Sequence, residues 1–342
     1  MVEFSDAIET GSELHWADQH VLDTEFDVRS GVGWSLAAAA TTSRTVAVSF
    51  LISHTVTDGQ GMLAGLATAL GPDRPPASLL RSPTRRADLA DAIGAGGRAH
   101  ARVTLATTTQ MGHDFNPLAM ALNGLRAARR RRQAPVSPPP HITVLVVDSN
   151  ELAAVAARYG GTATSLSIAL TANTTLALDD SGDQRIRLQM PVSRRAHDSP
   201  RGGNEVAATV VDLGPSHGRY TDLARIRSIS KQAYAHAAPV VMGAIADCDA
   251  ALSSVGAIPT VVANAFGTPT AMIPRSLRRR MPSNLPLSAR PSIMVFRTFT
   301  DLTTTFTFVG SHDRIASVAA AEFTAWGISP VAQWQNTRPD TR

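Results

Sequence analysis

A stretch in the middle of the chain divides the sequence into two parts. Residues 129–140 read Arg-Arg-Arg-Arg-Gln-Ala-Pro-Val-Ser-Pro-Pro-Pro. Because proline fixes φ and lacks a backbone N–H, neither a helix nor a central strand continues through such a run, and the chain stays extended. We therefore predict an N-terminal lobe over 1–128, a crossover linker over 129–140, a C-terminal lobe over 141–329 and a flexible polar tail over 330–342.

Strand and helix patterns occur together in the first lobe. Residues 33–40 and 44–53 predict a hairpin, with residues 41–43 as its turn. The second of these runs is almost entirely apolar, which is typical of a strand covered on both faces. Residues 62–70 have the composition and spacing of a helix, and Gly71 marks its end.

The second lobe shows the same mixture of patterns. Its predicted strands are 141–148, 185–193, 205–213 and 296–309, the last as a strand or a hairpin. Its predicted helices are 149–158, 165–178, 221–237 and 313–326. Strands and helices in this order predict a layered α/β or α+β fold.

Composition excludes several classes of protein. Hydrophobic residues make up 44% and charged residues 18% of the chain, which is typical of a globular protein. No apolar stretch reaches the roughly 18 residues of a membrane-spanning helix. The N-terminus carries acids where a secretory signal carries basic and then apolar residues, so the expected location is cytoplasmic. Cys248 is the single cysteine, which excludes an internal disulfide and a cysteine-based zinc site. We expect it in a helical segment, as a buried and inert thiol.

The basic residues are mostly arginines, and the net charge is +4. The cluster formed by Arg126 and Arg129–Arg132 could attract phosphate from a lipid headgroup, a nucleic acid or the pantetheine arm of a carrier. Aromatic residues make up only 5% of the chain and none interleaves with the cluster, which argues against nucleic acid as a partner. A solvated linker is the favoured interpretation. Peripheral contact with a membrane stays open as an alternative.

One short motif joins the apolar strand to the helix of the first lobe. It reads Ser53-His54-Thr-Val-Thr-Asp58-Gly59. A histidine that titrates near neutral pH can take a proton from a hydroxyl or an amine and return it later. Asp58 can accept backbone hydrogen bonds at the start of the helix, and Gly59 permits a tight turn. At the end of a strand, the loop beyond can face a cleft. This context favours His54 as a general base.

The other interpretations of the motif are less well supported. By itself, His-x-x-x-Asp-Gly also fits a capping aspartate beside a histidine without catalytic function. His54 and Asp58 could share one helix face, but no third ligand is evident, so we predict no metal site. The sequence contains no Gly-x-Ser-x-Gly elbow of serine hydrolases. It also lacks the glycine-rich loops that hold nucleotide phosphates.

Four segments in order carry a resemblance to a known superfamily. Val48–Met62, which contains the motif, resembles the active-site segment of the superfamily of condensation domains and chloramphenicol acetyltransferase. Within it, the sequence most resembles the bacterial wax ester synthase/diacylglycerol acyltransferase-like branch and the polyketide-associated acyltransferases. Gly31–Ala37 resembles that branch's Gly-Pro-x-Trp-x-Leu strand. Met190–Arg195 with Gly203–Val206 resembles its Pro-Val-Ser-x-Arg…Gly-Asn-x-Val pattern, and Pro282–Pro286 its Ser-Asn-Val/Leu segment.

This resemblance implies a fold and a reaction. The fold is two similar α/β lobes with a tunnel between them, which holds the histidine midway. His54 would deprotonate an alcohol or amine acceptor, which attacks an acyl thioester on CoA or on a carrier protein. The resemblance implies no permanently bound cofactor, since the acyl-CoA or acyl-carrier thioester is the donor substrate. Asp58 would be structural and pair with Arg195, with Arg194 as the less favoured partner.

The resemblance also assigns the remaining candidate residues. Ser53 stands where condensation domains carry the first histidine of a His-His pair. Asn204, Ser283 and Asn284 would hold loops, line the tunnel or donate hydrogen bonds to an oxyanion. Relatives carry several dozen more residues before the Gly-x-x-Trp strand, so we expect part of the first lobe to be missing. The alternative function is therefore a catalytically inactive binding or scaffold protein with the same fold.

Overall fold

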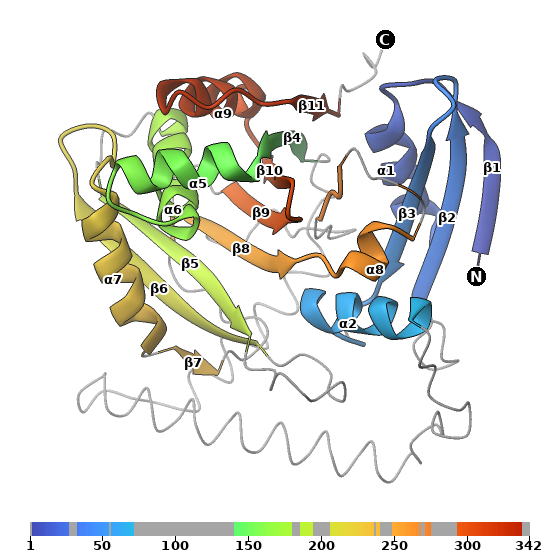
Figure 1. Ribbon diagram of the computed structural model, residues 1–342, viewed down its shortest axis with the longest axis horizontal. Coiled ribbons are helices and arrows are strands. Elements are labelled where there is room, and N and C mark those ends of the chain that lie inside the picture. Colours follow the sequence, from blue (N-terminus) through green and yellow to red (C-terminus); the bar gives the residue numbers. More distant parts are fainter. Residues whose placement is uncertain are drawn as a thin grey trace, which may run out of the picture.

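The structure is a computed structural model of the 342-residue chain, and it describes residues 2–26, 33–54, 56–71, 140–179, 185–193, 206–235, 237–239, 248–265, 267, 271–274 and 293–336. Two separate β-sheets and the helices packed on them make up these ranges (Figure 1). The mixed architecture confirms the predicted α/β or α+β fold class.

The smaller sheet is built from the N-terminal part of the chain. Its strands are β1 (Val2–Ile8), β2 (Trp34–Thr41) and β3 (Val46–Ile52), in that order. β1 runs parallel to β2, whereas β2 and β3 are antiparallel with Trp34 opposite Ile52. The predicted hairpin is therefore confirmed. Two helices accompany this sheet, α1 (Glu13–Asp23) and α2 (Gly59–Leu70).

The larger sheet has eight strands in the order β11-β4-β10-β9-β8-β5-β6-β7. Its strands are β4 (His141–Asp148), β5 (Arg185–Ser193), β6 (Val206–Pro215), β7 (Ala238–Pro239), β8 (Ala250–Ala257), β9 (Ile293–Phe299), β10 (Thr303–Gly310) and β11 (Ala332–Gln335). Most neighbours are antiparallel, but β5, β8 and β9 run parallel to one another. β9 and β10 form the hairpin that the sequence predicts over 296–309.

Helices cover one face of the larger sheet. They are α5 (Ser149–Arg158), α6 (Ala163–Leu178), α7 (Leu223–Ala235) and α9 (Ile315–Ala325), all close to their predicted bounds. α6 is enclosed by the sheet and the other helices, so its apolar and small polar residues are buried all round rather than along one stripe. This arrangement places the main core between the helices and the sheet.

A buried carboxylate ties three parts of this core together. Glu322 of α9 is 8% exposed and accepts hydrogen bonds from Asn173 Nδ2 at 2.7 Å and from Trp326 Nε1 at 2.7 Å. It also accepts two bonds of 2.9 Å from Arg219, from Nε and Nη2. Asn173 in turn exchanges hydrogen bonds with the backbone of Tyr220. The charge is thus fully hydrogen-bonded inside the core, as a buried charge must be.

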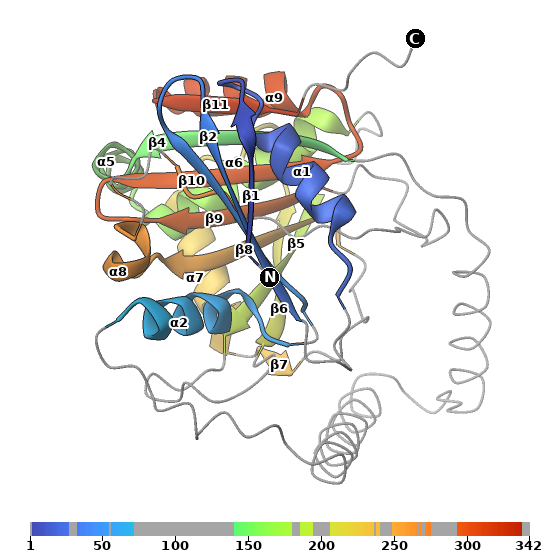
Figure 2. The same cartoon turned by 90° about the vertical axis from the view of Figure 1, so that its right-hand side faces the viewer.

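The two sheets meet through α1 and α2. From the side, the strands of the smaller sheet cross in front of those of the larger one (Figure 2). Leu14 of α1 packs with Ile142, Val144 and Val146 on the face of β4 that the helices leave open. α2 packs on the end of β8 and on the short helix α8 (Thr260–Ala263). These contacts hold the predicted site loop against the larger sheet.

Three local expectations are wrong. β3 is not covered on both faces, since Ser49 is its only buried residue and the side chains that share a face with Trp34 are partly or largely exposed. The tail does not begin at residue 330, because β11 pairs with β4 and Asn336 accepts a 2.6 Å hydrogen bond from Ile142 N. Cys248 lies outside any helix, just before β8, and is partly exposed.

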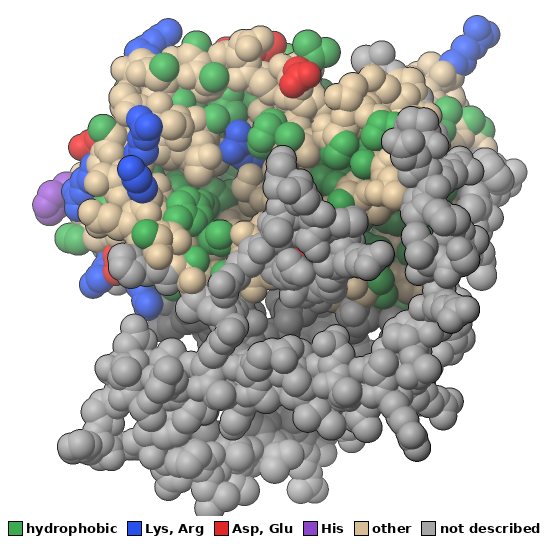
Figure 3. All heavy atoms as spheres, turned by 60° about the horizontal axis from the view of Figure 1, so that its bottom comes forward, with side chains coloured by type: hydrophobic (Ala, Val, Ile, Leu, Met, Phe, Trp, Pro, Cys, Tyr) green, Lys and Arg blue, Asp and Glu red, His purple; other side chains and the backbone are tan. Residues whose placement is uncertain are grey.

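The expected partners include phosphate groups and a membrane surface, for which the exposed basic residues and the hydrophobicity of the helices are relevant. Figure 3 shows lysine and arginine side chains gathered toward its left edge, and the exposed basic residues on and beside α7 are Arg219, Arg225, Arg227 and Lys231. The predicted cluster of Arg126 and Arg129–Arg132 lies outside the described residues. Within the described ranges, no helix reaches the length and hydrophobicity of a bilayer-spanning segment.

Candidate active site

The motif forms the turn that leads from β3 into α2. Ser53 N donates to Gly33 O at 2.8 Å, which fixes the end of β3 against the start of β2. The turn closes when Val56 N and Thr57 N donate back to Ser53 O at 2.8 Å and 3.4 Å. His54 is the first residue beyond this anchor and is exposed, whereas Ser53 is partly buried. The imidazole therefore stands on a rigid strand end and is accessible from solvent.

Asp58 caps the helix, as the sequence predicts. It has the extended conformation of an N-cap (φ −85°, ψ 175°), and its Oδ1 accepts a 2.8 Å hydrogen bond from Gly61 N. Only 5% of Asp58 is exposed. A negative charge at a helix N-terminus is favourable because the backbone dipoles place partial positive charge there. Asp58 thus shapes the turn that presents His54.

Replacing Asp58 with alanine is expected to lower the free energy of unfolding by about 1 kcal/mol, because Gly61 N loses the side-chain acceptor that caps α2. Asp58→Asn keeps an acceptor at the cap and should retain most of that free energy. Equilibrium urea unfolding of both variants measures the difference. An equal loss in the two would mean that the charge itself contributes, as the predicted pair with Arg195 requires.

Gly59 allows close packing rather than a tight turn. Its backbone is helical, at the first position of α2. A Cβ at Gly59 would lie 3.1 Å from Val255 Cγ1 at the end of β8, closer than most Cβ contacts. Beside it, Gly256 has a φ of +102°, and a Cβ there would lie 3.5 Å from Gln60 Nε2. The start of α2 therefore packs closely on the end of β8, with the Val255 side chain against Gly59 and the Gln60 side chain beside Gly256.

The remaining predicted site residues lie outside the described ranges. They are Arg194, Arg195, Asn204, Ser283 and Asn284. The pairing of Asp58 with an arginine, the oxyanion donors and the tunnel therefore stay predictions. Of the predicted site, the structure brings together His54, Asp58 and Gly59, with Ser53 at the anchor. Val255 and Gly256, which hold this loop from across the molecule, have no signal in the sequence.

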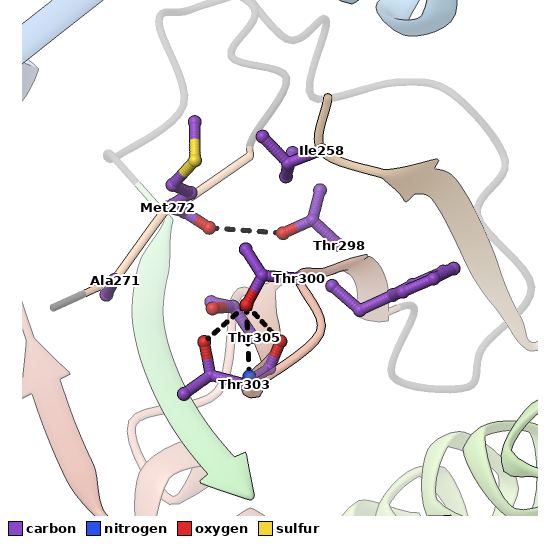
Figure 4. A pocket seen from close by; sticks show the side chains of 8 residues that line it. Ile258, Ala271, Met272, Thr298, Thr300, Thr303 and Thr305 are labelled. Carbon is purple, nitrogen blue, oxygen red and sulfur yellow. Dashed lines mark hydrogen bonds between the residues drawn. The ribbon is translucent and has the colours of Figure 1, made fainter. Parts of the chain in front are cut away.

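A small hollow lies on the open face of the larger sheet, next to the segment that contacts α2. Its volume is only about 10 Å³, and it is partly open to solvent. Figure 4 shows Thr298 donating to Met272 O, at 3.1 Å, and Thr300 bonded to Thr303. Hydroxyls and methyl groups line it, and its volume is that of about one water molecule. None of the predicted site residues borders it.

Comparison with solved structures identifies the fold. The condensation domain of the monacolin K polyketide synthase MokA aligns with a TM-score of 0.54 and 10% identity over 95% of this chain and 78% of that chain. The first condensation domain of the CDA synthetase aligns with a TM-score of 0.52 and 13% identity over 97% and 76%. The chain has the condensation-domain fold. No protein-family pattern and no curated protein sequence matches it.

The condensation-domain fold agrees with the superfamily that the motifs resemble. The closeness to the wax ester synthase-like branch stays a prediction from those motifs. A third similar structure, on condensation domain-mediated chain release from the enacyloxin polyketide synthase, aligns with a TM-score of 0.49 and 14% identity over 95% of this chain. The chain spans only 66% of the length of that structure.

Proposed function

We propose that this protein transfers an acyl group from a thioester to a hydroxyl or amine acceptor, with His54 as the general base. The observation that supports this most directly is the exposed imidazole at the end of β3, in the turn that Asp58 caps. It occurs in a chain with the condensation-domain fold, at the motif through which the sequence resembles that superfamily.

The proposed step needs one group that exchanges a proton. His54 accepts the proton of the acceptor O–H or N–H while that atom attacks the thioester carbonyl carbon. The tetrahedral intermediate then expels the thiolate, which takes the proton from the imidazolium and leaves as a thiol. A positioned base of this kind typically contributes about 10²–10⁴ in rate. The ester or amide and the free thiol are the products.

The donor is proposed to be bound to a carrier protein or to CoA. The MokA and CDA synthetase structures described above are condensation domains of a synthase and a synthetase, which favours a carrier. A CoA donor with a long-chain alcohol as acceptor is what the wax ester synthase-like motifs favour. Both thioesters present the same carbonyl to His54, so the chemistry above is common to them.

Turnover of purified protein tests this function. Acyl-CoA and acyl-carrier donors are each combined with a long-chain alcohol, a short alcohol and an amine, and free thiol and acylated acceptor are measured. We expect thiol release that depends on the acceptor and matches the product formed. Binding of acyl-CoA or acyl-carrier without any turnover would contradict the proposal and support the inactive binding protein instead.

A further inference from the structure

A charged residue occupies a core-facing position of β9. Side chains along a strand alternate between its two faces, and Ile293 and Val295 belong to the core beneath the helices. Arg297 is the next position in this row, and only 7% of it is exposed. Its guanidinium carbon lies 5.0 Å from the ring centroid of Phe299. β9 therefore carries a cation into the helix-covered side of the sheet.

This cation has no counter-charge in the described part of the chain. None of the carboxylates there forms an ion pair with Arg297, and its buried Nε has no hydrogen-bond partner. Burial lowers the pKa of Arg297 to about 10, an effect that Tyr234 partly opposes. A group with that pKa is still charged at pH 7. A buried charge destabilises a folded protein unless a partner compensates it, so a cation at this position favours the binding of an anion.

Two residues with hydroxyl groups, Ser254 and Tyr234, lie near Arg297. Ser254 of β8 stands beside Arg297 in parallel register, on the same face, and is exposed to solvent. Tyr234 of α7 approaches from the helix layer, and its hydroxyl lies 3.6 Å from Met190 Sδ on β5. The core-facing rows of β8 and β9 thus change from apolar to polar at this level. An exposed residue next to the buried cation provides a way in from solvent.

The position in the fold also points to a ligand. Arg297 and Ser254 lie toward the carboxyl ends of β8 and β9, which are parallel to each other and to β5. In open α/β sheets, ligands bind outside the carboxyl ends of parallel strands. A guanidinium binds the two oxygens of a phosphate or carboxylate in a planar, paired geometry. We propose that Arg297, with the hydroxyls of Ser254 and Tyr234 beside it, binds a small oxyanion.

Thermal unfolding with added anions tests this site without any turnover. Sodium phosphate and sodium acetate are compared with sodium chloride at equal ionic strength, for wild type, Arg297→Met and the exposed control Arg225→Met. At an anion concentration about a hundred times Kd, we expect the Tm of wild type and of Arg225→Met to rise by about 4 °C. Arg297→Met should not respond. Without anion, it should melt no lower than wild type, because an uncompensated charge has been removed.

Two results would overturn the proposal. One is a wild-type Tm that neither phosphate nor acetate raises above its value in chloride. The other is an anion-free Arg297→Met that melts several degrees lower and that Arg297→Lys restores, since this is the behaviour of an internal ion pair. Should Arg297→Met fail to fold, Tyr234→Phe provides the test, with a smaller Tm response expected and an unchanged one contradicting the site.

The same measurement identifies the source of the anion. 4′-Phosphopantetheine and pantetheine differ only in the phosphate, so a Tm rise with the first alone would assign the site to the phosphate of a thioester arm. A rise with inorganic phosphate but with neither of these would assign it to a free anion. Because this experiment measures binding and not turnover, it can contradict the anion site while the proposed acyl transfer holds. Likewise, the transfer can be contradicted while the anion site holds.

Discussion

Alanine at position 54 is expected to lower the rate of acyl transfer by about 10²–10⁴-fold and to leave the melting temperature unchanged. The rate falls because no other group takes the acceptor proton in the proposed step. Stability should persist because His54 is exposed, and the turn around it is held by Ser53 and Asp58 through backbone hydrogen bonds. Product formation under saturating donor, together with thermal unfolding, measures the two effects.

An exposed histidine elsewhere is the matched control for this substitution. His15 lies on the outer side of α1 and is exposed, so His15→Ala should retain full activity. Product formed at the same rate by His54→Ala and wild type would remove His54 from the mechanism. A fall in kcat with an unchanged KM would place the lost interaction in the chemical step rather than in substrate binding.

Among the substitutions considered, Glu322→Ala is expected to be the most destabilising. It should lower the free energy of unfolding by about 3–5 kcal/mol. The substitution leaves the buried Trp326 Nε1 without an acceptor, removes one of the two acceptors of Asn173 Nδ2, and removes the partner of Arg219. It also empties the space between α6 and α9. Urea unfolding gives the free energy, and an unchanged m-value would show that the unfolded state is the same.

Removing the donors to Glu322 one at a time separates their contributions to the free energy of unfolding. Trp326→Phe keeps an aromatic ring but loses the indole N–H, so it should cost about 1–3 kcal/mol, less than Glu322→Ala. Arg219 is 40% exposed, so Arg219→Met should cost less again, since water can replace the guanidinium. A Glu322→Ala protein as stable as wild type would mean that this network contributes no net free energy.

Local patterns were sufficient to predict much of the fold. The two apolar runs of the first hairpin, joined by a short polar turn, predict β2 and β3 in their observed antiparallel pairing. α6 was predicted within two residues of its observed bounds, although its buried surface follows no single stripe. β9 and β10 were recognisable because residues 296–309 are rich in threonine and phenylalanine, which suit a pleated surface.

The strands at the sheet edges were not predictable in the same way. β1 reads Val-Glu-Phe-Ser-Asp-Ala-Ile and pairs in parallel with β2, an arrangement that no local turn signals. β11 has only four residues and depends on hydrogen bonds to β4, almost two hundred positions away. Short polar strands take their structure from the neighbour that pairs with them.

In the candidate site, too, local interactions were predictable and contacts between distant residues were not. The cap of Asp58 on α2 is a local interaction over three residues, and the sequence predicted it. The contact between Gly59 and Val255 joins residues far apart in the chain, so only the folded structure shows it. Arg297 was passed over for the same reason, because a single arginine in an apolar strand looks like a surface position until the helices above it are known.

The contact between Gly59 and Val255 has a mechanical consequence. His54 belongs to the N-terminal part of the chain. The helix that follows it, α2, packs against β8 of the C-terminal part. A displacement of β8 would therefore displace the start of α2, and with it the turn that carries His54. The orientation of the His54 side chain thus depends on the contact between the N-terminal and C-terminal parts of the chain.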